Sequence, residues 1–173
     1  MRRIFTIISA LLIATTLTAC GAGQNAATRK ITQVTDGVEV KVTQNGSAIK
    51  ILNLLLVATE NGDAVVVGTI INQGAEPDQL LGIAVGGGSA TITGDTTLAK
   101  NAPLRFEGES ANVKAVFSGV NPVPGRHVTL SLGFARAGLV TAEVIIRDKR
   151  DDYKNVTSGL PEVNASPDSP QPE

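Results

Sequence analysis

The segment ILNLLLVATENGDAVVVGTIINQGAEPDQLLGIAV, residues 51–85, contains three apolar runs separated by two turn-forming stretches. The first run, residues 49–59, is almost continuously apolar, which is typical of a central strand covered on both faces. A loop containing Asn-Gly at residues 61–63 joins this run to the next, and two apolar runs so joined predict a β-hairpin. The stretch NQGAEPD, residues 72–78, turns the chain again before the third run. We therefore expect three consecutive strands here.

The chain between residues 31 and 150 continues this pattern of short strands. Apolar and polar residues alternate in GVEVKVT (37–43), in NVKAVFSGV (112–120) and in RHVTLSLGF (126–134). Turn residues recur about every 8–12 positions, and no stretch combines a helical period with helix caps. The apolar residues are mostly Val, Ile, Leu and Ala, with no Trp and only 3% aromatics, a composition that suits packed sheets. We expect an all-β sandwich over residues 31–150.

The N-terminus has the features of a bacterial lipoprotein signal. Arg2 and Arg3 precede the apolar stretch at residues 4–19, which is shorter than the roughly 18 apolar residues of a spanning helix. The stretch ends in LTAC, residues 17–20, which resembles the lipobox. The alternative is an ordinary signal peptide with a chance cysteine. We expect a lipoprotein signal peptide over residues 1–19 and lipidation of Cys20.

A lipid on Cys20 would hold the mature protein on the extracytoplasmic face of the cell membrane, since two or more acyl chains give stable anchoring. Cys20 is the only cysteine, so no intramolecular disulfide can form. Small polar residues 20–30 are expected to form a flexible tether. The formal charge is −1 and becomes −3 once Arg2 and Arg3 leave with the signal. This charge favours neither nucleic acid nor anionic lipid as a partner.

The C-terminal residues 151–173 are polar and rich in proline. Pro161, Pro167, Pro170 and Pro172 stand among few apolar residues. Such a segment buries too little surface to offset its ordering entropy. We expect it to be disordered.

Two parts of the chain resemble the PCu(A)C-like domain. Residues 51–85 resemble that family's strand–hairpin–strand region, and VPGRHVTLSLGFARAGLVTAEVIIRD (123–148) resembles its closing pair of strands. Phe134, Ala137, Gly138 and Val140 carry the second likeness. With LTAC in front, the chain is most similar to actinobacterial LpqE-type lipoproteins. The resemblance spans roughly residues 34–148 and implies a cupredoxin-like Greek-key β-sandwich.

The copper site that this resemblance implies does not carry over to the sequence. Copper-binding members have a His-x-Met before a glycine; placing Gly119 on that glycine puts Lys114 at the His and Val116 at the Met. The upstream His and Met should fall within residues 90–108, which contain neither residue type. We therefore expect no metal or other cofactor site of the family type.

The inventory of soft donors leads to the same expectation without any alignment. Cu(I) favours thiolate, thioether and imidazole ligands. Met1 is the only methionine and Cys20 the only cysteine, and both are used or removed if the lipoprotein signal is processed. His127 remains as the only imidazole, and one imidazole does not make a soft-metal site.

Other chemistry is equally sparse. His127 as a general base would need a nucleophile elbow, and none is present, so we interpret it as a polar residue at a strand end. Glu60, Asp63, Glu76 and Asp78 lack the convergent spacing of a calcium site, and turn chemistry explains them. We expect no catalytic residues and no enzyme activity.

Three functions remain open from the sequence. The first is a membrane-anchored, non-catalytic β-sandwich that binds an unknown protein, peptide or glycan of the cell envelope, because edge strands and loops suit such recognition. The alternative is an extracytoplasmic copper chaperone of the PCu(A)C type. An enzyme is the third.

We predict that Cys20→Ser abolishes lipid attachment, because the chain has no other thiol. Partitioning of the wild-type protein and the variant between detergent and water measures this. Equal partitioning into the detergent phase would contradict the lipobox assignment.

Overall fold

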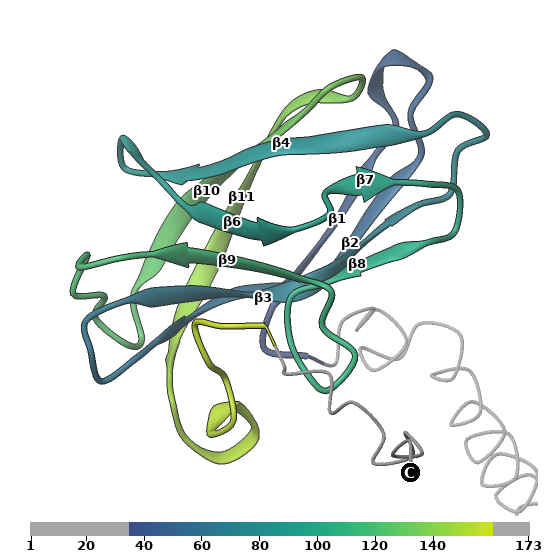
Figure 1. Ribbon diagram of the computed structural model, residues 1–173. Coiled ribbons are helices and arrows are strands. Elements are labelled where there is room, and N and C mark those ends of the chain that lie inside the picture. The colour runs from purple at the N-terminus through teal and green to yellow at the C-terminus, as the bar shows by residue number, and fades with distance from the viewer. Residues whose placement is uncertain (1–34, 161–173) are drawn as a thin grey trace, which may run out of the picture. The chain divides into compact units, whose positions relative to one another are not determined.

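Strand β2 (Ile49–Ala58) lies at the centre of the sheet and pairs with three other strands. It runs antiparallel to β1 (Val38–Val42) and β3 (Ala64–Asn72), and parallel to β11 (Gly138–Asp148). The structure, a computed structural model, describes residues 35–160 (Figure 1). The hairpin expected around residues 61–63 is confirmed as the β2–β3 turn, where the Thr59 and Asp63 backbones are hydrogen bonded.

The described strands form one hydrogen-bonded sheet in the order β5-β4-β10-β11-β2-β3-β9-β6, with β1 on β2, β7 on β4 and β8 on β3. The first and last strands of this order, β5 and β6, are separated in sequence only by Ala90. The sheet must therefore curl until its two ends meet, which gives a barrel-like sandwich (Figure 1). This confirms the predicted all-β sandwich. The remaining strands are β4 (Asp78–Val85), β5 (Gly88–Ser89), β6 (Thr91–Gly94), β7 (Thr97–Leu98), β8 (Pro103–Arg105), β9 (Val113–Phe117) and β10 (His127–Phe134).

The main core lies inside the curled sheet. Alternation in β9 directs Val113, Ala115 and Phe117 into it, and alternation in β10 directs Leu130 and Leu132 into it, as the sequence predicts. The side chains from β2 that reach this core include Ile51, Leu54 and Leu56. A bulge at Asn53, whose φ is 50°, shifts the register between Leu52 and Leu55.

A second, smaller apolar cluster covers the opposite side of β2, β3 and β9, which we call the outer face. It consists of Leu55, Val57, Val65, Val67, Val116, Tyr153 and Val156. β2 is thus buried on both faces, as its continuous apolar run predicts. Tyr153 and Val156 provide the cover from the chain after β11.

This cover belongs to the part of the chain expected to be disordered. Tyr153 ends the short 3-10 helix η3 (Asp151–Tyr153), and both Tyr153 and Val156 are buried. The Tyr153 hydroxyl donates to a carboxylate oxygen of Asp36 at 3.4 Å, and Asp36 also pairs with Arg147 at 3.4 Å. The ordered domain therefore extends beyond residue 150 to at least Val156, because two apolar side chains find a complementary face.

Asp78 fixes the turn between β10 and β11 from the start of β4. Its carboxylate is buried and accepts hydrogen bonds from the backbone N–H groups of Gln79, Arg136 and Ala137 at 2.8–3.0 Å. A buried carboxylate is tolerated when backbone donors satisfy it. Asp78 is therefore a structural residue.

Several sequence-based expectations lie outside the described residues. The signal peptide, Cys20, the tether at residues 20–30 and residues 161–173 belong to this group. Within residues 35–160, no helix is long and apolar enough to cross a membrane.

Candidate functional site

The two positions that the resemblance assigns to a copper-binding His-x-Met lie together on the outer face. Lys114 and Val116 are two residues apart on β9, so their side chains share one side of the strand. Val116 pairs with Val65 and is 9% exposed. Lys114 pairs with Thr93 and is 3% exposed. The sequence predicts a strand at this position but does not predict that the lysine is buried. Val116 is covered, and neither Lys114 nor Val116 offers a soft donor to a metal.

The described residues do not fit a copper ion. Residues 90–108 form β6, β7, β8 and their connections and bring no histidine, methionine or cysteine to the outer face. In the part of the chain that the structure describes, no group of three or more His, Cys, Asp or Glu side chains could hold a metal. His127 is exposed at the first residue of β10, opposite Ile145 of β11. It has no soft donor partner there.

Two of the four acidic residues weighed for calcium, Asp63 and Asp78, hold turns through their carboxylates. Asp63 accepts a hydrogen bond from the backbone N–H of Gly119 at 2.9 Å, and Asp78 holds the β10–β11 turn. The backbone carbonyl of Glu76 accepts from the Asn72 side chain at 2.7 Å. These contacts agree with turn chemistry.

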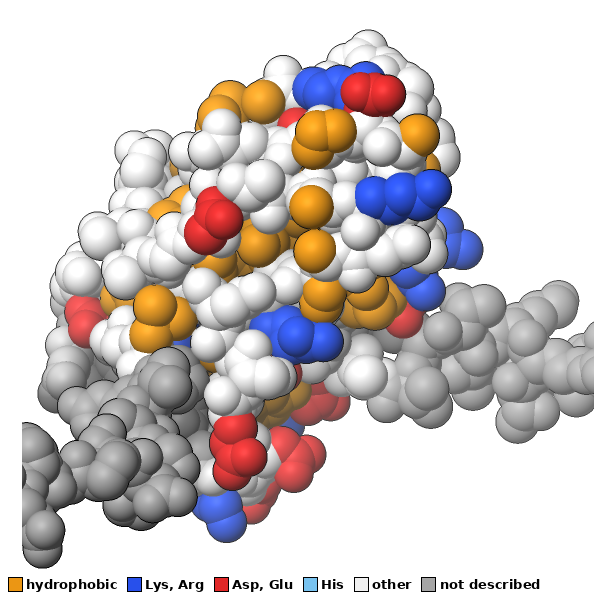
Figure 2. All heavy atoms as spheres, turned by 45° about the vertical axis from the view of Figure 1, so that its right-hand side comes forward, with side chains coloured by type: hydrophobic (Ala, Val, Ile, Leu, Met, Phe, Trp, Pro, Cys, Tyr) orange, Lys and Arg blue, Asp and Glu red, His pale blue; other side chains and the backbone are white. Residues whose placement is uncertain are grey.

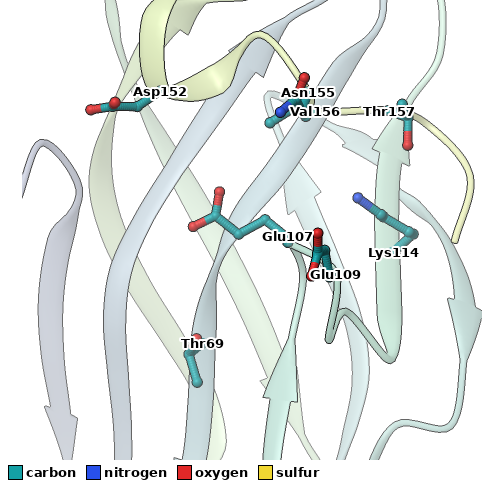
Figure 3. A pocket seen from close by; sticks show the side chains of 9 residues that line it. Thr69, Glu107, Glu109, Lys114, Asp152, Asn155, Val156 and Thr157 are labelled. Carbon is teal, nitrogen blue, oxygen red and sulfur yellow. The ribbon is translucent and has the colours of Figure 1, made fainter. Parts of the chain in front are cut away.

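A pocket opens beside Lys114, between the β8–β9 loop and the segment that follows η3. We call it the Lys114 pocket; its volume is about 580 Å³. In Figure 3 the ammonium of Lys114 points from β9 into this space, while the carboxylate of Glu107 points toward the side where Asp152 lies. The lining residues are Thr69, Glu107, Gly108, Glu109, Lys114, Asp152, Asn155, Val156 and Thr157.

The ammonium of Lys114 is the unusual group in this pocket. Within residues 35–160 no hydrogen bond and no ion pair within 4.0 Å joins it to another group. The residue as a whole is 3% exposed, but the ammonium itself is not fully buried. Burial lowers the pKa of Lys114, and the nearby charge of Glu107 opposes this shift without cancelling it. Burial likewise raises the pKa of Glu107, against the attraction of Lys114. Both groups are therefore desolvated without being directly paired.

A second hollow of about 290 Å³ lies near the β9–β10 loop and is mainly apolar. Val120 and Val123 on this loop are 46% and 54% exposed, and Val128 and Ile146 form part of its wall. It has no titratable side chain other than Arg126. It offers a contact surface but no reactive group.

The surface shows no sign of a polyanion-binding site on the face drawn in Figure 2, where basic and acidic side chains are interspersed among small apolar groups. A nucleic-acid site requires clustered Lys and Arg.

Comparisons with known proteins place the fold. The solved structures that match include an apo PCuAC domain from PmoF1 (24% identity, TM-score 0.53), a copper-bound PCuAC domain from PmoF2 (19%, 0.53) and an apo PmoF2 PCuAC domain (17%, 0.52). They cover 64–66% of this chain and 98–99% of their own length.

The chain has a PCuAC-like fold. The expected cupredoxin-like architecture is thereby confirmed. No family model matches the sequence, and no curated protein is similar to it. These similarities support the fold only, and the assignment to LpqE-type lipoproteins stays a prediction.

Sequence reasoning identified Lys114 and Val116 as replacements for ligands but missed the pocket. The alternation in NVKAVFSGV places both side chains away from the core. A valine on that side of the strand was the one indication in the sequence that the outer face is covered. The cover itself comes from Tyr153 and Val156, whose polar surroundings gave no periodic pattern.

We predict that alkaline pH stabilises the wild-type protein relative to Lys114→Met. Folding lowers the pKa of Lys114 from its ordinary 10.5, so below 10.5 the unfolded chain binds more protons than the folded one. The free energy of unfolding should therefore rise as pH increases through the folded pKa. Burial raises the pKa of Tyr153 above 10.0. Tyr153 therefore lowers the free energy of unfolding as pH increases, but only above pH 10.0.

Urea unfolding at a series of values from about pH 7 to about pH 10 tests this. The difference between the wild-type protein and Lys114→Met should shift in favour of the wild type as pH rises. Lys100→Met, which removes an exposed lysine, should follow the wild-type curve. Parallel curves for the wild type and Lys114→Met would contradict the desolvated ammonium.

Proposed function

We propose that this protein is a membrane-anchored, non-catalytic binding protein of the cell envelope that uses a PCuAC-like fold without a copper site. The observation that carries the proposal is the outer face. The ligand positions there hold Lys114 and Val116, and Tyr153 and Val156 cover the neighbouring strands. A Cu(I) site needs several convergent soft donors, and this face supplies none.

The absence of a reactive constellation among the described residues supports a binding role over catalysis. His127 stands alone at a strand end, and Asp63 and Asp78 are committed to backbone donors. The Lys114 pocket and the apolar hollow near Val120 and Val123 remain as surfaces for a partner. A protein, peptide or glycan of the envelope is the partner class that we propose.

A copper chaperone is the second candidate, and the comparisons favour it over a binding protein of unknown ligand. One of the similar structures is described as a copper-bound PCuAC domain. The donor set of this chain opposes the transfer of that role, since function resides in the site rather than in the fold. Copper would be cargo in this case, and the chain would need ligands other than the family's.

The place of action follows from the N-terminal sequence. Lipidation at Cys20 and a short tether would hold the domain on the extracytoplasmic face of the cell membrane. This is the arrangement of the LpqE-type lipoproteins that the sequence resembles. It is proposed here together with the binding function.

We predict that a chain beginning at Gly21 has no tight Cu(I) site. The test is a titration against a chromogenic Cu(I) chelator under reducing conditions, with the PCuAC domain from PmoF2, found copper-bound, as the positive control. The chelator should keep all the copper in the presence of this chain, and His127→Ala should change nothing. Copper withheld in a one-to-one ratio would overturn the proposal in favour of the chaperone.

A further inference from the structure

The Lys114 pocket contains an unsatisfied charge that the binding proposal does not yet explain. Lys114 is 3% exposed, and within residues 35–160 its ammonium has no hydrogen-bond acceptor. The ammonium is not fully buried, but it is unpaired at the edge of a pocket, and an anionic partner would form a charge-assisted hydrogen bond with it. A carboxylate entering the pocket would provide that partner.

The neighbouring groups are suited to complete such a contact. The side chains of Asn155 and Thr157 line the pocket, and in Figure 3 the Lys114 ammonium points toward their side of the space. The Asn155 amide can donate to a carboxylate, whereas the Thr157 hydroxyl donates to the backbone carbonyl of Gly159 at 3.1 Å. In this pocket the Lys114 ammonium, rather than backbone N–H groups, provides the positive charge for a bound anion.

A simple anion is nevertheless a poor match for the whole pocket. Glu107, Glu109 and Asp152 also line it, so three carboxylates stand against one ammonium. Their repulsion would oppose a ligand that carries negative charge alone. A simple cation is no better, because it would leave Lys114 unpaired and add a second positive charge beside it.

The two kinds of charge are separated within the pocket. No ion pair joins Lys114 to Glu107 in the described residues, and Figure 3 shows their charged ends directed toward different sides. Glu107 lies toward the side of Asp152, whereas Lys114 lies toward Asn155 and Thr157. Lys114 thus lies toward one side of this pocket of about 580 Å³ and Glu107 and Asp152 toward the other, with Glu109 drawn between Glu107 and Lys114.

We propose that the Lys114 pocket binds a small zwitterion, of the kind given by a short peptide with free amino and carboxyl ends. The ligand carboxylate pairs with Lys114 and receives a hydrogen bond from the side-chain amide of Asn155. The ligand ammonium faces Glu107 and Asp152. The volume lies within the usual range for small-molecule sites and exceeds the needs of a single small ion.

This inference deepens the proposed binding function, on which it rests, by naming a ligand class for one surface. The experiments distinguish failure of the proposed binding function from failure of this ligand class. The copper titration reports on soft donors, whereas the peptide titration described next reports on the charges of this pocket.

The test uses the full mature protein in detergent and three probes in isothermal titration calorimetry. The probes are the dipeptide Ala-Ala, its N-acetyl derivative, which lacks the ammonium, and its C-terminal amide, which lacks the carboxylate. We expect Ala-Ala to bind at least about tenfold more tightly than either capped form, as loss of one charge-assisted contact implies.

Substitutions then assign each charge to its end. Lys114→Met should weaken Ala-Ala binding about tenfold but should not weaken binding of the amide, which has no carboxylate and is repelled by the ammonium. Glu107→Gln should weaken Ala-Ala binding but not binding of the N-acetyl form, which has no ammonium. Lys100→Met, at an exposed lysine outside the pocket, should match the wild type.

Three results would overturn the proposal. The first is no binding of Ala-Ala by the folded wild-type protein. The second is equal affinity for the three probes. The third is a Lys114→Met variant, folded by its far-UV spectrum, that keeps the wild-type preference for the free carboxylate.

Discussion

The packing of Tyr153 and Val156 on the outer face of β2, β3 and β9 is the contact on which the rest of this structure depends. It makes β2 a strand buried on both sides, which its apolar sequence requires. Each fully buried apolar side chain contributes about 1.5–3 kcal/mol. The Tyr153 hydroxyl then joins this segment to Asp36 and, through it, to Arg147.

The same contact decides what chemistry the fold can support. In this chain the face that carries the ligand positions of the resemblance is closed by apolar packing at Val116 and turned into a polar pocket at Lys114. A PCuAC-like fold therefore presents here an unpaired ammonium and three carboxylates instead of sulfur and imidazole donors. The architecture is retained while the site is different, which is why the likeness of fold does not decide the function.

Much of the fold was predictable because it depends on alternation along single strands. The hairpin at residues 61–63, the inward faces of β9 and β10 and the double burial of β2 all follow from local pattern. The cover by Tyr153 and Val156 was not predictable, because two apolar residues in a polar, proline-flanked segment have no period. Asn155, Val156 and Thr157 of this segment line the pocket together with Lys114, so the pocket could not be found before the segment was placed.

The most direct measurement of this account is the free energy of unfolding of Tyr153→Ala/Val156→Ala in the full chain. Lys154→Ala/Thr157→Ala serves as the control, since both of these residues are exposed in the same segment. Loss of two buried side chains should lower the free energy by about 3 kcal/mol or more, whereas the control should stay within about 0.5 kcal/mol of the wild type. Equal stability of both variants and the wild type would show that the outer face is not covered.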